Sequence, residues 1–405
     1  MKVYELLTRL LIVLPLIFIF SCSNDDDEII VDPEPNAPLN YVFERNGEST
    51  VSYSGQTTRL KQANELYTEM NRTTLWDGSA TSESHLDLMF GGDNGLSGGF
   101  SNGTLNGTTK LIRSKTSAYA NTATNREVFD NMIAEYVSDV VPNFTAEASN
   151  GSAGAVTTGS STYQVNGKGQ ELDQLFFKSL IGAFTLDQIV NNYITPNQLD
   201  SGTRRDDNTN GVLYEDKNYT EMEHKWDEGF GYLYGEVEDV ESNFGLPTEN
   251  ESTGNLLMKY FKKVEENYEP GIAETVYNAF IAGRHAITIA DYAARDAAAM
   301  TIKKELSKVI GYYAINYLND YITKAGEGNV AKAHHSLSEA WGFMFSLQFT
   351  NNGNDTPYMD NTTIANALEN NFDNFFEQQD IYINNPGDGM IDQIKSAFGG
   401  VLNIQ

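Results

Sequence analysis

The 405-residue chain has only one cysteine, Cys22, and few basic residues: 27 Lys and Arg against 56 Asp and Glu. A single cysteine excludes an internal disulfide. The formal net charge of −29 argues against a nucleic-acid partner, because phosphate binding needs clustered Lys and Arg. A His-Glu-x-x-His zinc-protease helix is also absent, and we expect a binding protein rather than an enzyme.

Long apolar runs are scarce as well, and the clearest one, LIVLPLIFIF at residues 11–20, is shorter than a membrane span. Because it follows Lys2 and Arg9, it predicts a signal peptide over residues 1–21. The run ends in IFSC, which resembles the lipobox of bacterial lipoproteins. The resemblance implies that Cys22 carries the lipid after cleavage.

The segment after the cysteine, residues 22–40, is acidic and rich in proline, which is typical of a tether. Its start, SNDDDE, is similar to the export tag of surface lipoproteins in Bacteroidota. We therefore expect a protein held at the outer membrane by its lipid and facing outward.

The rest of the chain, residues 41–405, has the apolar periodicity of helices and predicts a mainly α fold. Asn46-Gly47 predicts a small hairpin, and residues 77–121 form a long glycine-rich insertion. Helices are predicted over residues 57–73, 124–141, 169–194, 219–241, 253–267, 271–299, 301–325, 330–350, 361–378 and 388–399.

A weak internal repeat runs through these helices. Residues 224–232, HKWDEGFGY, align without a gap with residues 335–343, HSLSEAWGF. An earlier pair of similar segments precedes them in the same order. The repeat predicts two related bundle halves, residues 122–241 and 253–350, followed by C-terminal helices.

The aligned segments place His224 with Glu228, and His335 with Glu339, each on one helical face. Imidazole and carboxylate suit iron, zinc or manganese, so two such pairs meeting in a bundle core predict a metal site. A structural pair, held by hydrogen bonds or ion pairs, is the alternative. The glycines after His224 indicate a closely packed face. His285 is a third candidate.

Taken together, the lipoprotein signal, the helical halves, EHKWDEGFGYLYG and GRHAITIADY resemble the family of lipoproteins called DUF4856. That family is more distantly similar to the imelysin-like proteins, which are iron-regulated lipoproteins of duplicated helical bundles. Gly283 and His285 fit the imelysin pattern Gly-x-His-x-x-Glu, but Thr288 stands where the pattern has Glu.

The resemblance implies binding of iron, haem, zinc or another metal as an accessory to uptake by a TonB-dependent transporter. A glycan-binding lipoprotein with a SusD-like role is the alternative. The aromatic content of 11% would permit stacking on sugars, although aromatics at helical spacing are more often core residues.

Overall fold

The structure is a computed structural model in which most of the chain after the predicted tether is defined. It describes residues 37–71, 81–119, 121–249, 251–377 and 380–404. Cys22, the predicted signal peptide and most of the predicted tether lie outside these residues. Within the described residues, no helix is long and apolar enough to cross a membrane.

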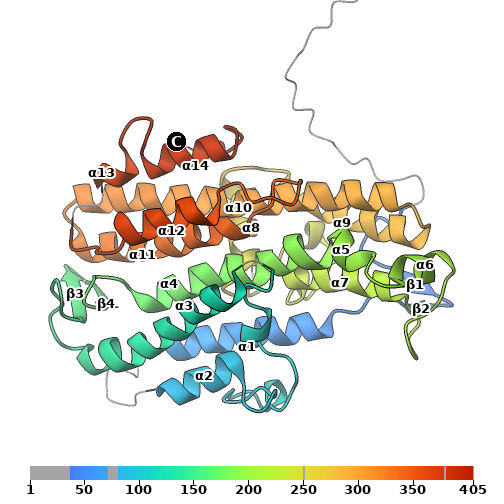
Figure 1. Cartoon of the computed structure of the whole chain (residues 1–405), viewed down its shortest axis with the longest axis horizontal. Coiled ribbons are helices and arrows are strands. Elements are labelled where there is room, and N and C mark those ends of the chain that lie inside the picture. The colour runs from blue at the N-terminus through green and yellow to red at the C-terminus, as the bar shows by residue number, and fades with distance from the viewer. Residues whose placement is uncertain (1–36, 72–80, 120, 250, 378–379, 405) are drawn as a thin grey trace, which may run out of the picture. The chain divides into compact units, whose positions relative to one another are not determined.

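The described chain is mainly helical, as predicted, with two small antiparallel hairpins (Figure 1). The helices are α1 (Ser54–Met70), α2 (Glu83–Gly91), α3 (Thr122–Glu135), α4 (Leu172–Leu180), α5 (Pro196–Leu199), α6 (Arg204–Thr209), α7 (Glu221–Tyr234), α8 (Leu257–Asn267), α9 (Ile272–Thr288), α10 (Tyr292–Gly326), α11 (Val330–Ser346), α12 (Asn361–Asn370), α13 (Asp380–Ile383) and α14 (Met390–Ala397). The strands are β1 (Glu44–Arg45), β2 (Glu48–Ser49), β3 (Gly154–Thr158) and β4 (Ser161–Val165).

The first hairpin turns where the sequence predicts. Asn46 and Gly47 connect β1 to β2 with φ angles of 57° and 81°. These left-handed conformations are the ones that an Asn-Gly hairpin turn requires. The turn folds the N-terminal segment back on itself. Arg45 of β1 then pairs with Glu223 of α7, and the Asn218 side chain, just before α7, donates to the Ser49 carbonyl of β2.

The prediction of one helix over residues 271–299 is wrong, because the chain breaks between α9 and α10. Ala290 has a left-handed φ of 59°, and the Asp291 side chain caps the first turn of α10. An aspartate cap stabilises a helix start and competes with an uninterrupted helix. His285 and Asp296 therefore lie on different helices.

Two glycine-rich segments are more ordered than the sequence indicates. The predicted irregular insertion contains α2, which packs against α1 and α3. The connection before α4 contains the β3–β4 hairpin, which packs against α11. Both elements are too short to show a clear apolar periodicity in the sequence. They are stabilised by the helices that pack against them.

One hydrophobic core includes residues from both predicted bundle halves. The longest helix, α10, packs against α9 and α11, and α11 also packs against α4 and α12 (Figure 1). After α4 the chain continues as two π-helical segments, η6 (Ile181–Leu186) and η7 (Gln188–Tyr193), and η7 packs against α7. The duplication stays a prediction; the structure adds that elements of one half pack on elements of the other.

Candidate functional site

The pair on α11 gains a second carboxylate from the start of α4. His335 Nε2 lies 3.4 Å from Glu339 Oε2, and His335 Nδ1 lies 2.6 Å from Glu171 Oε2. The imidazole ring stacks on Tyr163 of β4, with the ring centroids 4.4 Å apart. Burial alone would lower the pKa of His335, but the hydrogen bond to Glu171 and the two carboxylate charges raise it to about 9. The imidazole is therefore protonated at neutral pH.

The carboxylate of Glu339 is also bound by a lysine. Lys178 Nζ of α4 lies 3.1 Å from Glu339 Oε1, and the side chains are only 4% and 11% exposed. The two helices approach closely here because Gly342 faces Lys178: a Cβ on Gly342 would lie 2.4 Å from the Lys178 Cβ. The Lys178 ammonium also lies 5.6 Å from the ring centre of Tyr260. Glu339 thus already has a buried cation as its partner.

The pair on α7 is arranged in a related way. His224 Nε2 lies 3.9 Å from Glu228 Oε2, and Lys225 Nζ lies 2.7 Å from the same oxygen. The other oxygen of Glu228 accepts a hydrogen bond from Gln56 Nε2 at 2.9 Å. Burial lowers the pKa of His224, so this imidazole is neutral at pH 7. Its ring stacks on Tyr219.

The packed face that the glycines of α7 predict is present. A Cβ on Gly231 would lie 2.4 Å from the Cβ of Tyr53, and the Gly235 carbonyl accepts a hydrogen bond of 2.7 Å from the Thr57 hydroxyl. These contacts hold the start of α1 against α7. The glycines therefore serve helix packing, and they also bring Gln56 within reach of Glu228.

The two pairs do not join into one site. No hydrogen bond or ion pair connects them, or connects either with His285, among the described residues. In the same part of the chain, no group of three or more His, Cys, Asp and Glu side chains is arranged to hold a metal ion. The donor types suit a metal, but Lys178 and Lys225 occupy the place beside the carboxylates that a cation would take. The observed arrangement does not fit a bare metal ion.

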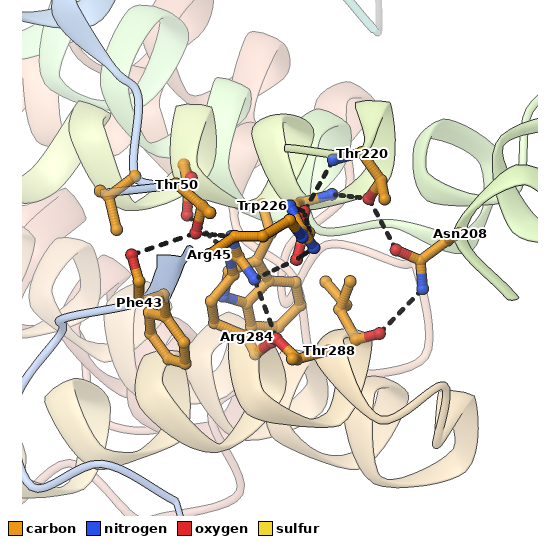
Figure 2. A network of polar contacts seen from close by, with 12 residues as sticks. Phe43, Arg45, Thr50, Asn208, Thr220, Trp226, Arg284 and Thr288 are labelled. Carbon is orange, nitrogen blue, oxygen red and sulfur yellow. Dashed lines mark hydrogen bonds and ion pairs between the residues drawn. The ribbon is translucent and has the colours of Figure 1, made fainter. Parts of the chain in front are cut away.

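A third polar group, buried except for its outer arginine, lies between the N-terminal hairpin, α7 and α9 (Figure 2). Arg284 donates to Asp227 Oδ1 at 3.0 Å, to Glu223 Oε1 at 3.1 Å and to the Thr50 hydroxyl at 3.0 Å. Arg45 of β1 also pairs with Glu223, at 3.0 Å. The partners of Arg284 come from elements that are distant in the sequence.

The imelysin-like residues lie beside this group and have a structural explanation. A Cβ on Gly283 would lie 2.1 Å from the Cζ2 atom of Trp226, so only glycine fits under the indole ring. Thr288, in the place of the expected Glu, accepts a hydrogen bond from Arg284 at 3.1 Å. His285 is half-buried, one residue beyond Arg284. Gly283 and Thr288 therefore have structural roles in the observed arrangement.

Residues 95–99, GLSGG, fit the spacing Gly-x-Ser-x-Gly of serine hydrolases. Ser97 lies in a loop, however, and not on the strand-to-helix turn that exposes such a nucleophile. Its hydroxyl is buried and donates to the backbone carbonyl of Leu105 at 2.7 Å. We therefore infer that Ser97 stabilises the loop and is not a catalytic nucleophile.

The fold and the polar groups define a mainly helical protein with two separate His/Glu pairs, each tied to a lysine. A family model described as "Domain of unknown function (DUF4856)" matches residues 38–396, and the chain belongs to this family. No curated protein and no solved structure gives a match. The similarity to imelysin-like proteins stays a prediction.

Proposed function

We propose that the protein is a surface lipoprotein, anchored through Cys22, that binds iron-bearing cargo for a TonB-dependent transporter in the outer membrane. The cargo in this proposal is an anionic chelate of iron, such as haem, and not the bare ion. Support for the anchor comes from the lipobox-like IFSC and the acidic segment after it. Support for the uptake role comes from the resemblance to iron-regulated lipoproteins.

The choice of a chelate over a bare ion rests on the lysines beside both predicted pairs. Lys178 is ion-paired with Glu339 in a nearly closed environment, and Lys225 is ion-paired with Glu228. A divalent cation at either carboxylate would lie next to an ammonium group where water screens little, which is strongly unfavourable. A chelate brings its own ligands for the metal and offers carboxylates to the protein instead.

Equilibrium dialysis of the chain without its lipid anchor tests this proposal. We expect retention of haem or ferric citrate, and no stoichiometric retention of zinc or ferrous ion. The double variant His224→Ala with His335→Ala is the control for a bare metal site. Stoichiometric zinc binding that this double variant abolishes would contradict the chelate proposal and restore a metal centre at the two pairs.

The SusD-like alternative is tested in the same preparation with a panel of glycans. Among the described residues, the most exposed aromatic side chains are those of Tyr119, Phe244 and Tyr382, which come from three segments distant in the sequence. Glycan binding generally uses aromatic rings that are exposed together, so this distribution favours the chelate proposal. Retention of a glycan without retention of haem or ferric citrate would favour the SusD-like alternative over the chelate proposal.

A further inference from the structure

Four basic residues lie within electrostatic range of one another near α7, although the chain as a whole is strongly acidic. This basic cluster consists of Lys115 and the three cations whose charge acts on it: Arg59 of α1, Lys110 of the same loop after α2, and Lys225 of α7. The ammonium groups of Lys115 and Lys225 lie 5.6 and 5.9 Å from the ring centre of Tyr193. The cluster therefore concentrates positive charge in a chain with 27 basic and 56 acidic residues.

Most of this positive charge has no carboxylate partner. Arg59 donates to the backbone carbonyls of Gly55 and Leu111. No ion pair or side-chain hydrogen bond involves the ammonium of Lys110 or Lys115 in the part of the chain that the structure describes. Only Lys225 is ion-paired, and its partner Glu228 also accepts a hydrogen bond from Gln56. The cluster thus contains four basic side chains and one paired carboxylate, which leaves an excess of positive charge.

The charges in the cluster act on one another. Burial and the nearby charge of Arg59 lower the pKa of Lys115, and Glu228 only partly offsets them. Asp187 touches the same loop through the backbone N–H of Ala118, but it is fully buried, and burial raises its pKa to about 7. Asp187 is therefore only about half ionised near pH 7 and offsets the basic charges in part. An incoming anion would relieve the repulsion between the lysines and accept hydrogen bonds from them.

We propose that the basic cluster is a binding site for the anionic, carboxylate- or phosphate-bearing end of a small molecule. The site lies between the start of α1, the loop of residues 108–119 and α7. Lys110 and Lys115 contact the anion, and Lys225 adds a third charge from α7. This proposal deepens the proposed function, on which it rests for the identity of the cargo as an iron chelate. His224 then belongs to the edge of an anion site, not to a metal site.

Lysine variants measured by calorimetry test the site directly. Lys110→Gln and Lys115→Gln each remove a charge without removing an ion pair, and haem, citrate and inorganic phosphate are the probes. We expect each variant to weaken binding of the preferred probe about tenfold, and the double variant to weaken it further. Lys304→Gln and Lys332→Gln, which remove exposed charges on α10 and α11, should bind within twofold of the original chain.

The thermal stability of the ligand-free variants separates binding from folding. Because the cluster is repulsive, Lys110→Gln should unfold at the same temperature as the original chain or at a higher one. If Lys110→Gln instead unfolds at a lower temperature than the original chain, Lys110 stabilises the fold, and its role in binding is overturned.

The outcomes also separate this inference from the proposed function. Haem binding that the variants leave unchanged would overturn the basic cluster as the site while the proposed function stands. The original chain could instead bind citrate or phosphate but neither haem nor ferric citrate. If the variants then lose that binding, the result would support the site and overturn the iron cargo. Binding of none of the probes by the original chain would overturn both.

Discussion

Replacing Arg284 with methionine removes the cation that joins the N-terminal hairpin to α7 and α9. Asp227, which is fully buried, would keep only the Tyr41 hydroxyl at 2.7 Å and the Ser52 N–H at 3.2 Å. Glu223 would keep Arg45. Breaking a buried ion pair from one side costs about 3–5 kcal/mol. We therefore expect Arg284→Met to lower the free energy of unfolding by about this amount at pH 8.

The loss of unfolding free energy in Arg284→Met should depend on pH, and the titration of Asp227 determines the direction of that dependence. Burial raises the pKa of Asp227 to about 6, although Arg284 opposes the shift, and its ordinary value is 3.8. Stability from this group is full below pH 3.8 and falls as pH rises through 6, by about 3 kcal/mol. Without Arg284 the pKa of Asp227 rises further and the fall extends to higher pH. The penalty of the variant should therefore be smaller at pH 5 than at pH 8.

Denaturant unfolding followed by tryptophan fluorescence measures both effects, because Trp226 lies beside the network (Figure 2). Arg113→Met is the matched control: its ion pair with Asp130 is 39% and 37% exposed and should contribute less than about 1 kcal/mol. Equal losses for the two variants, or a penalty for Arg284→Met that grows toward pH 5, would refute the reasoning.

Two further substitutions test the packing of α9 and the charge state of α11. Gly283→Ala should cost about 1–3 kcal/mol or more, because its Cβ meets Trp226, whereas Gly326→Ala, with nothing within 4 Å, should be neutral in the same unfolding assay. Glu171→Gln should lower the pKa of His335 from about 9 toward 6.5, measured by NMR titration. Since the stability from a raised histidine pKa is full below pH 6.5 and lost as pH rises through 9, this variant should lose stability at pH 6 and not at pH 10. An unchanged His335 titration would contradict the role given to Glu171.

Helical periodicity predicted the fold class and several helix positions well. The apolar repeat of residues 301–325 and the Asn-Gly turn of the first hairpin are local signals, and both are present in the structure. The break predicted near residue 300 is absent, because α10 is continuous from Tyr292 to Gly326. The break between α9 and α10 was missed because Ala290 and Asp291 leave the apolar periodicity nearly intact. The short β3–β4 hairpin was missed because its strands are stabilised by contacts with α11.

The candidate sites show where sequence reasoning ends. Spacing alone identified His335 with Glu339, since four residues make one helical turn. Glu171, just before α4, and Lys178 of α4 come more than 150 residues earlier, and no local pattern connects them with α11. Lys178 changes the interpretation most, because its buried ammonium lies beside the carboxylate of Glu339, where the sequence predicts a metal ion. Only the packing around Gly342 brings it there.

Iron uptake by cells tests the central claim most directly. Cells that carry the original gene, a deletion, or the double variant Lys110→Gln with Lys115→Gln would be given radioactive iron as haem or as ferric citrate. The account predicts that the deletion and the double variant both take up the preferred chelate more slowly, while the Lys304→Gln, Lys332→Gln control is unaffected. Equal uptake by the original and deletion strains for both chelates would contradict the account.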